Sequence, residues 1–279
     1  MVAALATATS AQAAWTFTGS DAGNNSNGNG VTITGVSAIA ATNGGTLASG
    51  LLGKVANDTV GVPNVTGANG FASGATWASA DLTWFGSSNG YGSQSNGSVP
   101  PTHAFDNGPA TDSTGKITGI GNTEAMYLSF SSAVSLNSIN LGYVYNDADI
   151  SVFRYTGTGT WSGATSLAGM AASGYALVGN YSNLSQGVNA INTGGATSSY
   201  WIIAAYNTAW GTGAGLDQGN DYFKILGVGA GASCTKGTAG CVSPVDGSVP
   251  EPTSLALVAI AGLGFVSARR RVMKGSTAA

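Results

Sequence analysis

Apolar and polar residues alternate along much of the chain, which is the pattern of a strand with one buried face. Residues 31–36 begin the pattern, where Val31 and Ile33 are separated by threonine. Further runs of this kind are residues 125–130, 134–141, 149–155, 175–178, 199–206 and 221–226. Residues 20–30 and 86–101 are rich in Gly, Ser and Asn, so we predict loops there, the second carrying Tyr91. Short strands separated by such turns predict an all-β protein with an antiparallel β-sandwich over residues 14–233.

The amino-acid composition excludes several classes of function. Only 8% of the residues are charged and the formal net charge is -3, while 43% are hydrophobic, enough for a substantial core. Four of the nine basic residues lie in the last eleven positions, which excludes a basic face for nucleic acid. One His and two Cys exclude most transition-metal and thiol-relay chemistry.

The N-terminus resembles the end of a signal peptide. Ala11 and Ala13 form the A-x-A pattern that signal peptidase recognises, so we expect cleavage after Ala13 and interpret residues 1–13 as the remnant of the signal. The alternative is an Ala-rich N-terminus of a cytosolic protein.

The C-terminus has three parts in a fixed order. Val249, Pro250, Glu251 and Pro252 must be extended, because each proline fixes φ and removes a donor. Residues 253–268 carry no charge and would span about 24 Å as a helix, so we predict a short transmembrane helix that is marginal as a permanent anchor. A basic cluster then predicts a cytoplasmic end under the positive-inside rule, with residues 275–279 as the tail. This cluster consists of Arg269, Arg270 and Arg271. The alternative is a buried C-terminal helix of a globular domain.

Residues 249–274 resemble the PEP-CTERM sorting signal of Gram-negative bacteria, which has a Pro-Glu-Pro motif, a short membrane helix and an Arg-rich end. The resemblance implies processing by an exosortase near residues 250–252 after transient anchoring in the inner membrane. It also implies delivery to the cell surface or the extracellular polysaccharide matrix.

The body shows a second resemblance. Four segments carry this resemblance, namely residues 103–111, 124–130, 134–142 and 149–152. They are similar to discoidin-like jelly rolls, although Asn107 stands where that pattern usually has Gly. They are also similar to exosortase-dependent surface proteins over roughly residues 75–274. The resemblance implies a jelly-roll-like ectodomain.

Acidic residues gather at three places that could bind Ca²⁺, which prefers six to eight oxygen ligands. Asp147 and Asp149 follow Asn146 at alternate positions, so their side chains should point to the same side of a strand entrance. Asp217 and Asp221 form a second group with Asn220, and Asp106 forms a third with Asn107. A structural Ca²⁺ is the one cofactor that these residues suggest. The alternative is ordinary turn chemistry, because Asn and Asp favour turns.

Two further predictions concern the cysteines and a group of aromatic side chains. Cys234 and Cys241 would form a disulfide that restrains a stem over residues 234–248, since a redox pair would have Cys-x-x-Cys spacing. Trp84, Phe85 and Tyr91 would stack on sugar rings if exposed, whereas burial in the core is the common alternative for aromatic side chains.

No catalytic constellation is recognisable. His103 precedes Asp106, but no Gly-x-Ser-x-Gly elbow supplies a nucleophile, and the acids form no marked pair for glycoside hydrolysis. The sequence therefore predicts a non-catalytic surface or matrix protein that meets signal peptidase, exosortase and extracellular polysaccharide. A carbohydrate-binding module and a secreted hydrolase stay open as alternatives.

Overall fold

The structure is a computed structural model that describes part of the chain. The described residues are 13–20, 30–42, 46–47, 65–66, 75–93, 103–112, 114, 116–119, 121–157, 169–217 and 219–231. Spatial clustering divides the chain into Met1–Ser233 and Cys234–Ala279, and all described residues belong to the first unit. The predictions for Ala11, for the two cysteines and for residues 249–274 lie outside the described residues.

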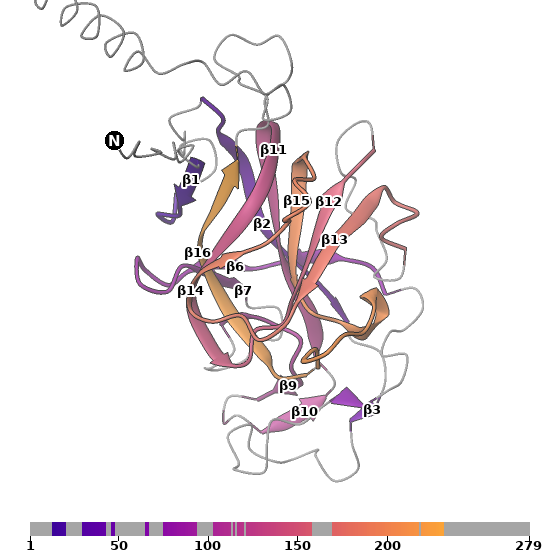
Figure 1. Ribbon diagram of the computed structural model, residues 1–279. Helices are drawn as coiled ribbons and strands as arrows, with labels where there is room; N and C mark the ends of the chain where they lie inside the picture. Colours follow the sequence, from indigo (N-terminus) through magenta and orange to yellow (C-terminus); the bar gives the residue numbers. More distant parts are fainter. Residues whose placement is uncertain are drawn as a thin grey trace, which may run out of the picture. The chain divides into compact units, whose positions relative to one another are not determined.

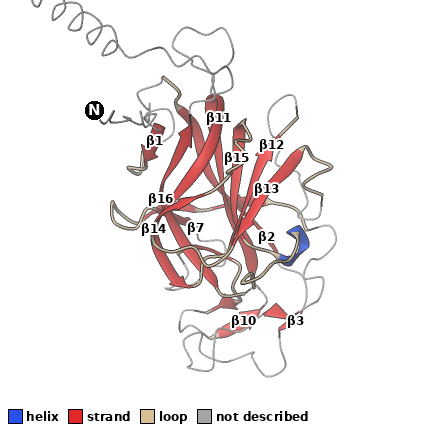
Figure 2. Ribbon diagram, viewed as in Figure 1, coloured by secondary structure: helices blue, strands red, loops and turns tan. Residues whose placement is uncertain are grey.

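The regular secondary structure of the described part consists almost entirely of strands, which loops and turns connect (Figure 2). They are β1 (Ala13–Thr16), β2 (Ile33–Thr42), β3 (Thr46–Leu47), β4 (Val65–Thr66), β5 (Ala78–Ala80), β6 (Leu82–Trp84), β7 (Tyr91–Ser93), β8 (Phe105–Asp106), β9 (Ala110–Thr111), β10 (Ile117–Gly119), β11 (Asn122–Asn146), β12 (Ile150–Tyr155), β13 (Tyr175–Tyr181), β14 (Gly187–Ala190), β15 (Ser198–Ala205) and β16 (Asp221–Gly231). The short 3-10 helix Thr208–Trp210 is the one helical element in this part of the chain. The all-β prediction is confirmed.

One long strand organises the large sheet (Figure 1). β11 pairs through its first half with β2 and β15, and through its second half with β16 and β14. The main path of the sheet is β13-β12-β15-β11-β16-β7-β6, and all pairings between named strands are antiparallel. The sequence predicted two strands where β11 is continuous, because the exposed residues 131–133 contain no turn-forming Gly, Pro or Asn and the backbone stays extended.

The core explains why the arrangement is sandwich-like. One cluster of buried side chains, which we call the main core, joins both halves of the sheet. It contains Met126 and Trp201 from one half and Leu136 and Phe223 from the other. A second cluster covers the opposite face of the first half and includes Trp77, Met170 and Trp210 from connecting segments. Strand β15 is therefore buried on both faces, which accounts for its nearly continuous apolar sequence.

The predicted loop over residues 86–101 is partly a strand. Residues 86–90 form a tight turn after β6, and Tyr91–Ser93 then pairs back with β6 as β7. Gly90 has φ +86°, and its backbone packs so closely on the carbonyl of Ile225 that a Cβ would clash there. Tyr91 lies in β7 with only 6% of its surface exposed, so the prediction of a loop tyrosine is wrong. Glycine at position 90 permits this packing.

The ends of the described part bear on two further predictions. Ala13, the residue after which cleavage is predicted, pairs with Ala230 as the first residue of β1. None of the helices in the described ranges is long and apolar enough to cross a membrane. The predicted membrane segment, residues 253–268, lies outside those ranges.

Candidate functional site

Three acidic side chains meet where β11 ends and where β12 and β16 begin. Asp147 follows β11 and makes an isolated bridge with Asp221, while Asp149 directly precedes β12. One carboxylate oxygen of each of the three lies within 4.8 Å of the others. The turn depends on Asn146, whose φ of 60° is in the left-handed region that Asn tolerates. We call Asp147, Asp149 and Asp221 the acidic cluster.

Backbone N–H groups fix the orientation of the cluster. Asp149 Oδ1 accepts a hydrogen bond from Asn183 N at 2.7 Å, and its Oδ2 accepts one from Asp217 N at 2.7 Å. Asp221 Oδ1 accepts one from Asp149 N at 2.6 Å. Each oxygen has a second lone pair, so these bonds leave room for a cation. The bonds also tie two loops to the sheet, because Asn183 and Asp217 come from different connections.

Asn107 is the neutral centre of the same network. Its Oδ1 accepts hydrogen bonds from Gly219 N at 3.0 Å and Asp221 N at 3.2 Å. Its Nδ2 donates to Tyr206 O at 2.7 Å and to Asp221 Oδ2. The side chain is fully buried. The sequence placed Asn107 with Asp106 in the third candidate calcium group, but it did not indicate the contacts of Asn107 with Asp221 and Tyr206.

The five acids predicted as calcium ligands do not all gather. Asp217 contributes its backbone N–H to Asp149, while its own side chain is exposed and its carboxylate is outside the cluster. Asp106 is buried and accepts a hydrogen bond from Gly108 N at 3.1 Å, and it is also outside the cluster. The structure therefore brings together three of the five predicted carboxylates. The reason is that the turn before β16 presents its backbone, not the Asp217 side chain, to Asp149.

Burial makes the ionised cluster costly. It raises the pKa of Asp149 from 3.8 to about 6, an effect that two backbone hydrogen bonds oppose and that Asp147 and Asp217 increase. Burial also raises the pKa of Asp221, and to a smaller degree that of Asp147, with neighbouring carboxylates adding to each shift. No basic side chain of the described ranges contributes to any of the three shifts. A bound divalent cation would supply the missing positive charge.

Metal-free protein should become more stable when the pH is lowered from about 7.5 to about 5. An acid whose folded-state pKa exceeds its unfolded-state pKa holds its proton more tightly in the folded protein. The stability of the fold therefore falls as the pH rises through the interval between the two pKa values, and it returns as the pH falls. For Asp149 the interval runs from 3.8 to about 6. Urea unfolding in chelator at the two pH values checks this, and a lower midpoint at the acidic pH would contradict it.

The three aromatic side chains predicted to bind sugar do not form one surface. Trp84 and Tyr91 meet edge to face, with ring centroids 5.0 Å apart, and Tyr91 also contacts Phe17 at 5.5 Å in the main core. The Tyr91 ring is therefore not available for stacking on a sugar, which corrects that assignment. Phe85 contacts a different group of side chains, with its ring centroid 5.4 Å from that of His103.

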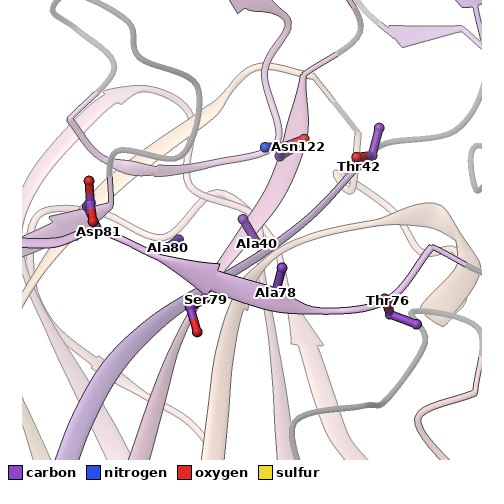
Figure 3. A pocket seen from close by; sticks show the side chains of 8 residues that line it. All are labelled: Ala40, Thr42, Thr76, Ala78, Ser79, Ala80, Asp81 and Asn122. Carbon is purple, nitrogen blue, oxygen red and sulfur yellow. The ribbon is translucent and has the colours of Figure 1, made fainter.

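A shallow pocket of about 350 Å³ lies beside β2 and β5 (Figure 3). Small side chains such as Ala40 and Ala78 form its floor, and Thr42, Asp81 and Asn122 stand around it. It contains none of the residues predicted to bind calcium or sugar. Of the described residues that line the pocket, one carries a carboxylate and none is aromatic.

Comparison with known proteins identifies the C-terminal segment. Residues 248–271 match the family model described as PEP-CTERM protein-sorting motif. The chain carries a PEP-CTERM sorting motif. The motif implies export, processing by an exosortase and membrane-transient sorting to the cell surface, as predicted from residues 249–274. No curated protein and no solved structure matches the chain, and the discoidin-like resemblance of the body stays a prediction.

Proposed function

We propose that the protein is a non-catalytic surface or extracellular-matrix protein of a Gram-negative bacterium, released by an exosortase and associated with exopolysaccharide. The observation that carries this proposal is the PEP-CTERM motif at residues 248–271. A body poor in charge and rich in Gly, Ser and Asn suits exposure outside the cell.

The surroundings of the lone histidine support a non-catalytic body. His103 stacks on Phe85, and its Nδ1 is buried without a hydrogen-bond partner among the described residues. A hydrolytic triad needs a carboxylate that orients the imidazole and a nucleophile that donates to it. Within the described ranges His103 has neither partner.

Deleting residues 249–279 is expected to abolish delivery to the cell surface, because the deletion removes the whole sorting motif. Fractionation of expressing cells, with immunoblots of the surface and periplasmic fractions, measures this. Deleting only residues 275–279 is the control and should leave delivery unchanged. Equal surface levels of the full chain and the 249–279 deletion would show that the segment is not the sorting signal.

The body holds a structural Ca²⁺ at the acidic cluster. This assignment is supported by three carboxylates within 4.8 Å of one another, which backbone hydrogen bonds orient and which have no basic partner in the described part of the chain. Carboxylate oxygens are the ligands that Ca²⁺ prefers, and extracellular sites of modest affinity are common. The ion would join the end of β11 to the starts of β12 and β16.

A carbohydrate-binding module is the second candidate function. The group around Phe85 favours it, because Phe85 and Tyr143 are partly exposed aromatic side chains near a basic one. Sedimentation of the full chain with the producer's own matrix polysaccharide tests it. If folded protein stays in the supernatant with every matrix fraction, the purely structural role of a coat protein is favoured.

A further inference from the structure

Lys224 is a buried lysine on the outer side of the sheet. It lies in β16 between Phe223 and Ile225, which both belong to the main core, so its side chain points to the opposite face. Its direct neighbour across the ladder is Tyr143 of β11. Only 9% of its surface is exposed. Lysine is rarely buried to this extent unless it is paired.

The ammonium group has aromatic neighbours but no hydrogen-bond acceptor among the described residues. Lys224 Nζ lies 4.0 Å from the ring centroid of Phe85 and 4.7 Å from that of Tyr143. Within the described part of the chain, no carboxylate or carbonyl oxygen accepts a hydrogen bond from it. Cation-π contacts replace only part of the hydration that an ammonium loses when its side chain is mostly buried. Burial accordingly lowers the pKa of Lys224.

His103 adds a second nitrogen group without a partner. Its ring is nearly parallel to that of Phe85, at 24°, and its Nδ1 is buried with no partner among the described residues. Burial lowers the pKa of His103, and the charge of Lys224 lowers it further. Two nitrogen groups therefore contact the Phe85 ring, and among the described residues no acid neutralises the ammonium. A buried group of this kind in a native structure calls for an explanation.

We propose that Lys224 and His103 bind the carboxylate of an acidic polysaccharide, with Phe85 and Tyr143 beside the sugar ring. This proposal rests on the carbohydrate-binding function and names its ligand as a uronic-acid polymer. The carboxylate supplies the missing charge and acceptor, and the aromatic side chains offer apolar surface to the C–H groups of the sugar. Exposed Ser87 and Ser88, in the turn that follows Phe85, supply hydroxyl groups nearby.

The test compares the binding of three polymers to the full chain by isothermal titration calorimetry. The polymers are sodium polygalacturonate, neutral dextran and poly-L-glutamate. We expect polygalacturonate to bind more tightly than the other two, and Lys224→Met to weaken this binding about tenfold or more, the effect of one charge-assisted hydrogen bond. Lys116→Met is the matched control, since Lys116 is exposed and the same charge is removed. The control should bind like the original chain.

Folding and ligand class are checked separately. Methionine keeps the apolar stem of Lys224 and removes an unpaired charge, so the variant should melt no lower than the original protein. If it melts lower, NMR of the unaltered chain decides, because the cross-peaks of Lys224 and Phe85 must move when polygalacturonate is added. Stationary cross-peaks, or equal binding by Lys224→Met, would overturn the site. Preferred binding of dextran would keep the carbohydrate-binding function without this site, and equal binding of poly-L-glutamate would overturn the sugar assignment.

Discussion

Millimolar Ca²⁺ is expected to raise the melting temperature of the protein by roughly 5–10 °C relative to chelator at neutral pH. A ligand that binds only the folded state stabilises it by about 2.7 kcal/mol at a hundredfold excess over Kd, and a domain of this size gains about 2–4 °C per kcal/mol. The gain arises because the ion offsets the repulsion among three carboxylates, two buried and one partly exposed, that have no basic partner among the described residues.

Asp147→Asn should remove most of this calcium response. Asp147 is the suitable position because it is partly exposed and its carboxylate accepts a hydrogen bond from the adjacent Ala148 N, which an asparagine side chain can also accept, so the variant should fold. In chelator the variant should be at least as stable as the original, since one of three repelling charges is gone. Asp81→Asn is the control, an exposed acid outside the acidic cluster, and should keep the full response. Thermal melts followed by circular dichroism measure all three proteins. An unchanged melting temperature of the original chain across millimolar Ca²⁺ would leave these residues as turn anchors only.

Asn107→Ala is expected to reduce the free energy of unfolding by about 3–5 kcal/mol. The substitution removes the side-chain oxygen that accepts hydrogen bonds from two buried N–H groups, those of Gly219 and Asp221. It also removes a donor to the carbonyl of Tyr206. It also leaves the buried Asp221 carboxylate with one fewer donor. Each buried polar group left without a partner costs about 1–3 kcal/mol, so the losses accumulate at this single position.

Asn189→Ala is the matched control for this experiment. Asn189 also donates two side-chain hydrogen bonds, to the carbonyls of Ser185 and Gly187, but it is partly exposed, so water can replace the lost partners. Its cost should stay below about 1 kcal/mol. Urea denaturation with linear extrapolation measures both variants. Equal losses for the two would mean that Asn107 is not the centre of the network.

Local sequence was sufficient for the features that depend on short segments. The alternation in residues 31–36 and the apolar run in residues 199–206 predicted strands, because side-chain direction in a strand has a period of two residues. The sorting motif was equally accessible, since its three parts follow one another along the chain. Asp147 and Asp149 could be paired for the same reason, because their spacing is two residues.

Only the tertiary structure decided which distant residues complete each site. Asp221 is hydrogen-bonded to Asp149, which lies 72 residues away in the sequence, and to Asn107, which lies 114 residues away. The antiparallel register of β11, β16 and β8 brings these residues together. Lys224 meets Phe85 by the same folding of the sheet, and Tyr91 is buried because β7 returns onto the core. The chain itself therefore determined the strands, the turn-forming acids and the sorting signal, since these follow from local backbone and side-chain chemistry. Strand register and burial determined which residues meet in the acidic cluster and around Lys224. Both arise from pairings between distant segments, and the sequence of one segment does not indicate which other segment it pairs with.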